Sequence, residues 1–115
     1  MNERDLTRLE DMLLYASDAI TLLGDTDAAG LAANRMMELA VSHAVQIVGE
    51  AAARVSDETK IATPSIPWRA ITGMRNILVH DYGRIDLAIL VAAVRQHLPS
   101  LVEDLKTLLG PEPDQ

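Results

Sequence analysis

Apolar residues recur in steps of three and four along most of the chain, which is the spacing of one face of an α-helix. The first stripe predicts a helix from about residue 4 to Leu23 and consists of Leu6, Leu9, Leu13, Ala16, Ile20 and Leu23. The second predicts one helix over residues 28–55 and consists of Met37, Val41, Ala44, Val48, Ala51 and Val55. Polar residues and two prolines then interrupt the pattern over residues 56–67.

Two further helices are predicted in the second half of the chain. Pro67 suits the first turn of a third helix because its missing N–H needs no partner there. This helix should run to about residues 81–82, with Gly83 as its stop. Asp86 is placed to cap a fourth helix, whose stripe continues through Leu87, Val91, Val94, Leu98, Leu101, Leu105 and Leu108. Pro99 lies inside that stripe and should kink or divide the helix.

These elements predict an all-α protein. Helices joined by short links favour an up-down four-helix bundle, with a short fifth helix as a variant, that spans residues 1–110 as one domain. Residues 111–115 are expected to form a flexible tail. The chain has no Phe and one Trp, so the core must be built from aliphatic side chains and Met. The absence of Cys excludes disulfides, zinc–thiolate sites and thiol nucleophiles.

Charge is unevenly distributed along the chain. The net charge of −7 by itself disfavours general nucleic-acid binding, because phosphate contacts need a basic surface. Residues 61–95 nevertheless carry four Arg against two Asp, whereas the segments before and after them are both net negative. This basic segment is either a functional surface or a solvated face, and charge alone does not separate the two.

Other classes of protein lack support in the sequence. The longest apolar run, Leu87–Val94, is far shorter than the roughly 20 residues that cross a bilayer. The N-terminus alternates charge and lacks the apolar segment of a signal peptide, so we expect a cytoplasmic protein without a membrane contact. The three histidines form no close-spaced metal-ligand pair and there is no glycine-rich phosphate loop, so we expect no metal and no cofactor.

The reactive side chains gather in one stretch, GMRNILVHDYGRID, residues 73–86. Within it Arg75 and His80 are spaced as Arg-x4-His. Histidine titrates near neutral pH and suits a base that takes the proton of a ribose 2′-hydroxyl. Arginine stays protonated, and its planar fork matches phosphate oxygens on which charge builds up. The pair therefore supplies the two groups that RNA cleavage without a metal needs.

Helical geometry sets a condition on this pair. Positions five apart on a regular α-helix differ by about 140°, so Arg75 and His80 would not share a face, whereas Asn76 and His80 would. The pair converges only if the helix unwinds near Gly83, if Arg75 reaches round, or if a second copy supplies the missing partner. Gly73 is small enough to permit the close approach of that second copy, so we expect a homodimer with both motifs in one cleft.

The segment PWRAITGMRNILVHDYGRID resembles the signature of HepT-like toxins, which are small helical ribonucleases of the HEPN superfamily. The segment QIVGEAAARVSDE, residues 46–58, is similar to the second helix of that family. The likeness covers most of the chain in length and in helix order. Its most specific part is the Arg-x4-His-x-Tyr element, with GMRN at its start and a following Ile-Asp.

The resemblance implies a dimer of four- or five-helix bundles and a metal-independent endoribonuclease, the toxin of a type VII toxin–antitoxin system. In that family Arg75 and His80 match the catalytic pair, and Asn76 matches the polar residue beside the arginine. The substrate is RNA, with tRNA and mRNA both open. The implied partner is a small nucleotidyltransferase antitoxin of the MntA type, which can silence the toxin by AMPylation of the tyrosine that corresponds to Tyr82.

Structural roles for the same residues stay open. His80 can favour the negative end of a helix dipole, Arg75 can pair with Asp81, and Tyr82 can be a partly buried anchor. Under that interpretation the protein is a non-catalytic helical adaptor that binds a nucleotidyltransferase through its bundle. Trp68, at the start of the third helix, is interpreted as a packing anchor.

Overall fold

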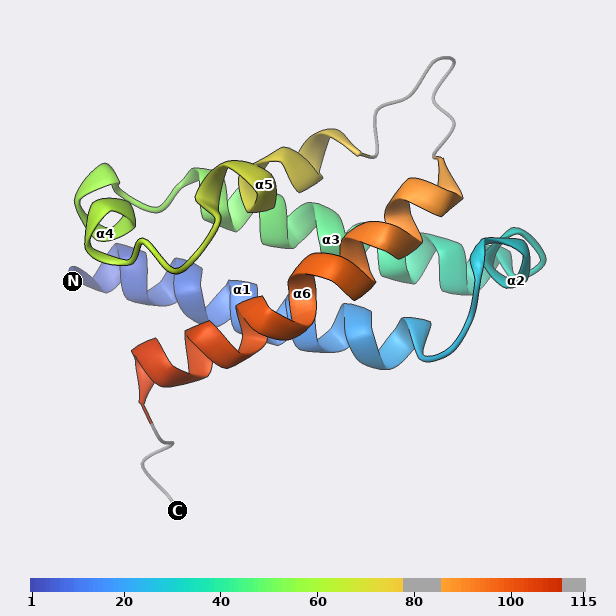
Figure 1. Ribbon diagram of the computed structural model, residues 1–115, viewed down its shortest axis with the longest axis horizontal. Helices are drawn as coiled ribbons and strands as arrows, with labels where there is room; N and C mark the ends of the chain where they lie inside the picture. The colour runs from blue at the N-terminus through green and yellow to red at the C-terminus, as the bar shows by residue number, and fades with distance from the viewer. Residues whose placement is uncertain (78–85, 111–115) are drawn as a thin grey trace.

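Three long helices form the body of the fold in the computed structural model, which describes residues 1–77 and 86–110 (Figure 1). They are α1 (Glu3–Leu23), α3 (Arg35–Ala53) and α6 (Leu87–Leu109), and α1 packs along both of the others. The chain direction alternates from α1 to α3, then to the short α5 (Trp68–Gly73), and finally to α6 (Figure 1). The predicted all-α up-down bundle is confirmed.

The core is aliphatic, as the lack of Phe requires. Its largest fully buried side chains come from every layer of the bundle: Leu9, Met12, Leu23, Leu31, Val41, Val45, Ile71, Met74, Leu90, Leu98, Leu101 and Leu105. Six of them belong to the predicted stripes: Leu9, Leu23, Val41, Leu98, Leu101 and Leu105. The periodicity therefore identified most of the inward faces of α3 and α6, whereas the stripe of α1 included the exposed Leu6 and missed the buried Met12 and Ala19.

The second predicted helix is wrong at its start. The chain forms a short α2 (Ala28–Ala32) and then begins α3 afresh at Arg35. The break falls at Asn34, whose backbone leaves the helical region (φ −133°, ψ 89°) and whose side chain accepts a hydrogen bond from the backbone N–H of Met37 at 3.1 Å. An asparagine that caps the next helix in this way competes with continuation of the previous one.

The segment that interrupts the apolar pattern contains one more helix, α4 (Asp57–Ala62). Ser56 begins it, because the Ser56 hydroxyl accepts a hydrogen bond from the backbone N–H of Thr59. Capping by a serine followed by acidic residues in the first turn stabilises even a short helix. The polar composition of this segment reflects an exposed helix and its cap.

Within the described residues, the third predicted helix is α-helical only from Trp68 to Gly73. The chain then continues as a 3-10 turn, η1 (Met74–Asn76). Its predicted stop at Gly83 lies outside the described residues, as does the predicted tail at 111–115.

Helix α6 begins where expected, because the Asp86 carboxylate accepts a hydrogen bond from the backbone N–H of Ile89 at 3.2 Å. It then runs to Leu109 without being divided at Pro99. Pro99 is exposed, so the carbonyl that loses its helical donor lies on the side that water can reach. No helix among the described residues is long and apolar enough to cross a membrane.

Candidate functional site

Arg75 lies in the 3-10 turn η1, directly after α5. Ile71 and Met74 are buried and hold α5 and η1 against the core. The side chains of Arg75 and Asn76, in contrast, are exposed. The expected offset of about 140° between Arg75 and His80 applies to a regular α-helix, and that helix ends before Arg75. In a 3-10 turn, each residue is rotated by about 120° relative to the one before it. The backbone of Arg75 is fixed while its guanidinium reaches solvent.

The position of Arg75 depends on Gly49 in α3. A β-carbon at Gly49 would lie 2.5 Å from the backbone nitrogen of Arg75, 3.0 Å from its Cβ and 3.1 Å from its Cα. Only a residue without a side chain permits this approach of two backbones. Gly73 behaves differently, since a β-carbon there would meet nothing within 4 Å. Gly49 is therefore the glycine that positions Arg75 within the chain.

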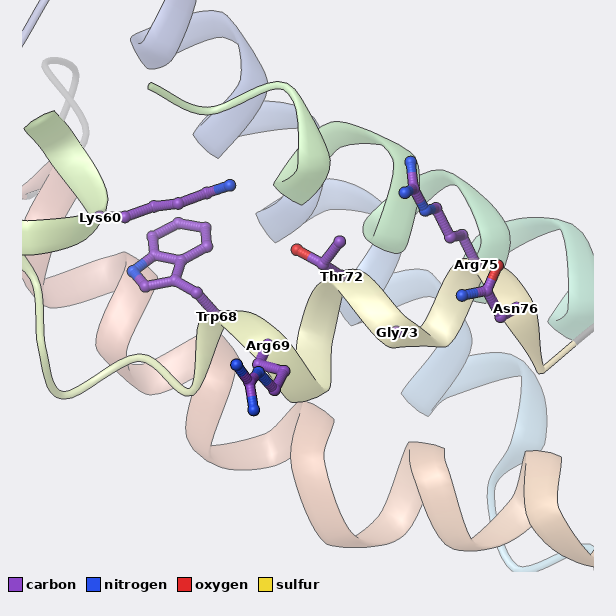
Figure 2. A pocket seen from close by; sticks show the side chains of 7 residues that line it. All are labelled: Lys60, Trp68, Arg69, Thr72, Gly73, Arg75 and Asn76. Carbon is purple, nitrogen blue, oxygen red and sulfur yellow. The ribbon is translucent and has the colours of Figure 1, made fainter. Parts of the chain in front are cut away.

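A groove of about 400 Å³ runs along α5 and η1. It is lined by Lys60, Trp68, Arg69, Thr72, Gly73, Arg75 and Asn76, none of which is acidic. Figure 2 shows Trp68 and Lys60 at one end and Arg75 and Asn76 at the other, with Thr72 and Gly73 between them. Within residues 1–77 and 86–110, no carboxylate forms an ion pair with the three cations of this groove.

The aromatic end of the groove is held by α4. The indole nitrogen of Trp68 donates to the carbonyl oxygen of Thr63 at 3.3 Å and to its hydroxyl oxygen at 3.1 Å. The ammonium of Lys60, also from α4, lies 5.8 Å from the centre of the Trp68 ring (Figure 2). Trp68 is half-buried, so it is an anchor, as predicted, and also a wall of the groove.

Helix α4 is in turn tied to α1 by a buried carboxylate. Asp5 is 2% exposed and accepts hydrogen bonds from the hydroxyls of Ser56 and Thr59, each at 2.5 Å, and from the backbone N–H of Ser56 at 3.0 Å. The Ser56 hydroxyl, followed by the Thr59 hydroxyl and the Ser56 N–H, lowers the pKa of Asp5 below its ordinary value of 3.8. The anion is thus the form that holds α4, and with it Lys60 and Trp68, in place.

The basic segment noted in the sequence divides into two roles. Arg69 and Arg75 line the groove. Arg95 does not, because its guanidinium donates to the carbonyl oxygens of Gly24 at 3.3 Å and Thr26 at 2.8 Å, which ties α6 to the end of α1. The positive charge at the groove is instead completed by Lys60, which precedes that segment.

The structure brings two of the four predicted site residues together, Arg75 and Asn76. His80 and Tyr82 lie outside the described residues, so their distance from Arg75 and the exposure of Tyr82 remain predictions. No three His, Asp or Glu side chains of the described part of the chain cluster as metal ligands would.

Five residues of the site were not recognised as such from the sequence: Gly49, Lys60, Arg69, Thr72 and Trp68, which was interpreted only as a packing anchor. A signal was present for Arg69 and Thr72. Arg69, Thr72, Gly73 and Asn76 follow the three-and-four spacing of one helical face, opposite the buried Ile71 and Met74. Lys60 and Gly49 belong to other helices and carried no such signal.

The chain is similar in sequence to proteins named as ribonucleases. A protein family described as "HepT-like: Ribonuclease HepT-like" matches residues 7–108. A protein of Methanocaldococcus jannaschii named "Putative RNase MJ1380" is 33% identical over 92% of this chain and 98% of its own length. A second protein of that organism, "Putative RNase MJ0125", is 26% identical over 95% of each chain.

A third relative is "Probable ribonuclease HepT" of Thermococcus cleftensis, which is 35% identical over 59% of this chain and 62% of its own length. No solved structure matches the chain. The family match includes α3, α5, η1 and α6, and therefore both Gly49 and the exposed Arg75. Because this family matches residues 7–108 and a relative is 33% identical over 92% of the chain, the chain belongs to the HepT-like ribonuclease family.

Proposed function

We propose that this protein is a metal-independent endoribonuclease in which Arg75 and His80 form the catalytic pair. The observation that carries the proposal is the exposed guanidinium of Arg75 at one end of a groove that holds two further cations and no acid. A phosphate arriving there meets positive charge that no described carboxylate neutralises. Family membership supplies the reaction class, and the groove supplies a place for the RNA backbone.

The proposed reaction uses the 2′-hydroxyl of the RNA as the nucleophile. His80 takes the proton of that hydroxyl, the 2′-oxygen bonds to phosphorus, and the bond from phosphorus to the 5′-oxygen breaks. Arg75 stabilises the negative charge that builds up on the phosphoryl oxygens. The departing 5′-oxygen needs a proton, which a protonated second histidine can give. Asn76, beside Arg75, supports the substrate by hydrogen bonding.

A homodimer would provide that second histidine. In the proposed dimer the two copies of Arg75 and His80 face one cleft, so that one His80 acts as base and the other as acid. The open space at Gly73 leaves room for a neighbouring chain along this face. Light scattering at micromolar concentration should give the mass of two chains, and a monomer that still cleaves RNA would contradict this arrangement.

The proposed biological setting is a type VII toxin–antitoxin pair. The partner is a nucleotidyltransferase antitoxin of the MntA type, and the modified residue is Tyr82. AMP on Tyr82 would place a negative phosphate two residues from His80, where it repels the RNA backbone and competes for Arg75. Modification would therefore silence the ribonuclease by charge as well as by bulk.

An RNA cleavage assay tests the central proposal. The purified protein should cut single-stranded RNA equally well with and without EDTA, and leave a 2′,3′-cyclic phosphate. His80→Ala should lower the rate by about 10²–10⁴, the usual contribution of a general base. If Arg75→Ala and His80→Ala both cut at the wild-type rate, the catalytic assignment is wrong. Binding of the nucleotidyltransferase without any cleavage would favour the adaptor role.

A further inference from the structure

The end of the groove away from Arg75 has no part in the proposed chemistry, yet it is built as a binding surface. Trp68 and Arg69 come from the first turn of α5, and Lys60 comes from α4. An aromatic ring, two cations and the Thr72 hydroxyl thus meet in one groove, and none of its lining residues is acidic. Such a set suits a group that carries both a flat ring and negative charge.

Trp68 is held in a fixed orientation. Its indole N–H donates to two oxygens of Thr63, and the Thr63 hydroxyl donates to the carbonyl of Thr59 at 2.7 Å. The polar edge of the indole is therefore satisfied inside the protein. The apolar face of the indole is therefore the part of Trp68 available to a ligand. Because the ring is already ordered, binding to it costs little side-chain entropy.

Lys60 covers this face only loosely. Its ammonium is 5.8 Å from the ring centre, at the outer limit of a cation–π contact. No described carboxylate pairs with it. A phosphate can therefore draw the ammonium away from the ring, and the same movement uncovers the indole for a planar group.

We propose that the Trp68 end of the groove binds one nucleotide of single-stranded RNA, with its base stacked on the indole and its phosphates contacting Lys60 and Arg69. This inference rests on the proposed ribonuclease function. It adds the place where the protein holds a nucleotide close to the cleaved bond. Trp68 and Arg75 are about 10 Å apart along a helical axis, so the bound nucleotide is a near neighbour of that bond. Stacking requires an unpaired base, which makes single strands the preferred substrate.

Trp68 is the only tryptophan of the chain, so its fluorescence reports on this subsite directly. The probe is a mixed-sequence single strand with 2′-O-methyl groups, which binds but cannot be cleaved because its 2′-oxygen carries no proton. We expect saturable quenching that weakens with added salt. A duplex of the same sequence should quench far less.

Variants separate stacking from charge, with binding measured by the anisotropy of a fluorescein-labelled strand. Trp68→Ala should weaken binding by about 5- to 150-fold, the range found for one base–aromatic stack. Trp68→Phe keeps an aromatic ring and should lose less affinity. It therefore distinguishes lost stacking from a variant that fails to fold. Lys60→Ala and Arg69→Ala should each reduce the slope of log affinity against log salt concentration by about one, which corresponds to the loss of one phosphate contact. Lys106→Ala, an exposed lysine of α6 outside the groove, is the matched control.

Three results would overturn the subsite: quenching equal for duplex and single strand, affinities unchanged in Lys60→Ala and Arg69→Ala, or an acidic peptide that binds as tightly as the oligonucleotide. Tight binding of the acidic peptide would assign the groove to a protein partner.

The underlying ribonuclease proposal fails under different results. Quenching without cleavage of natural RNA would reject the enzyme and keep the subsite, whereas cleavage with an unchanged KM in the Lys60 and Arg69 variants would reject the subsite and keep the enzyme.

Discussion

Gly49 and Arg75 meet through their backbones, and α3 thereby fixes the residue proposed to bind the scissile phosphate. The clearance is so small that a β-carbon at Gly49 would lie 2.5 Å from the backbone nitrogen of Arg75. The contacting atoms belong to the backbone and to Cβ, so they cannot rotate away as the end of a long side chain could. The placement of Arg75 is thus a property of how α3 and η1 pack.

Gly49→Ala should destabilise the fold and displace Arg75. We expect a loss of about 1–3 kcal/mol in the free energy of unfolding, the usual range for overpacking, together with a fall in RNA cleavage. Urea unfolding followed by circular dichroism measures the first effect. The control for stability is Gly73→Ala, which has open space and a helical backbone and should gain about 0.4–1 kcal/mol. Equal stability of the two variants would contradict the packing argument.

The fork of Arg75 should matter as well as its charge. Arg75→Ala should lower kcat by about 10²–10³, as the loss of one preorganised donor to a developing anion does. Arg75→Lys should recover only part of this, because an ammonium cannot make two parallel hydrogen bonds to a phosphate. Lys106→Ala controls for the loss of one surface cation. Full activity of Arg75→Lys would show that charge alone suffices.

Tyr82 should be the site of AMPylation. After incubation with the nucleotidyltransferase and ATP, intact-protein mass should rise by whole AMP units and RNA cleavage should fall. Tyr82→Phe removes the acceptor oxygen and should keep its activity under the same treatment. Tyr15, the other tyrosine of the chain, provides the control variant Tyr15→Phe, which should still be modified. A mass increase that persists in Tyr82→Phe would rule out this residue.

The Asp5 network should make stability depend on pH in the acidic range. Because the folded pKa of Asp5 is lowered below 3.8, its contribution is fully present above that ordinary value. It is lost as the pH falls through the lower, folded value. The free energy of unfolding of the wild type should therefore drop more steeply below about pH 4 than that of Asp5→Asn.

At neutral pH, Asp5→Asn should already be less stable by about 1–3 kcal/mol, since it leaves buried hydroxyl donors poorly matched. Asp18→Asn, on the exposed surface of the same helix, controls for the loss of one negative charge. Parallel pH profiles for the wild type and Asp5→Asn would show that the carboxylate does not hold α4.

Local patterns in the sequence predicted the parts of this protein that depend on neighbours along the chain. The stripe of α6 gave most of its buried face, and Asp86 was recognised as the cap of that helix. The stripe of α1 was right at Leu9, Ala16 and Leu23 but also included the exposed Leu6. The Arg-x4-His spacing drew attention to Arg75 because its chemistry is visible in a short segment. The second helix was mispredicted where the side chain of Asn34 turns back to cap α3, since apolar periodicity does not register a single capping hydrogen bond.

Only the tertiary structure decided which distant residues share the groove. Lys60 and Trp68 belong to different helices, and they meet because the Trp68 indole donates to Thr63 at the end of α4 while the buried carboxylate of Asp5 ties α4 to α1. Gly49 lies in the segment QIVGEAAARVSDE, but its role depends on the distance between two backbones that are far apart along the chain. Periodicity reports which face of a helix is buried. The distance between two packed elements depends instead on the side chains between them. Which side chains these are is determined only by the packing of the whole folded core.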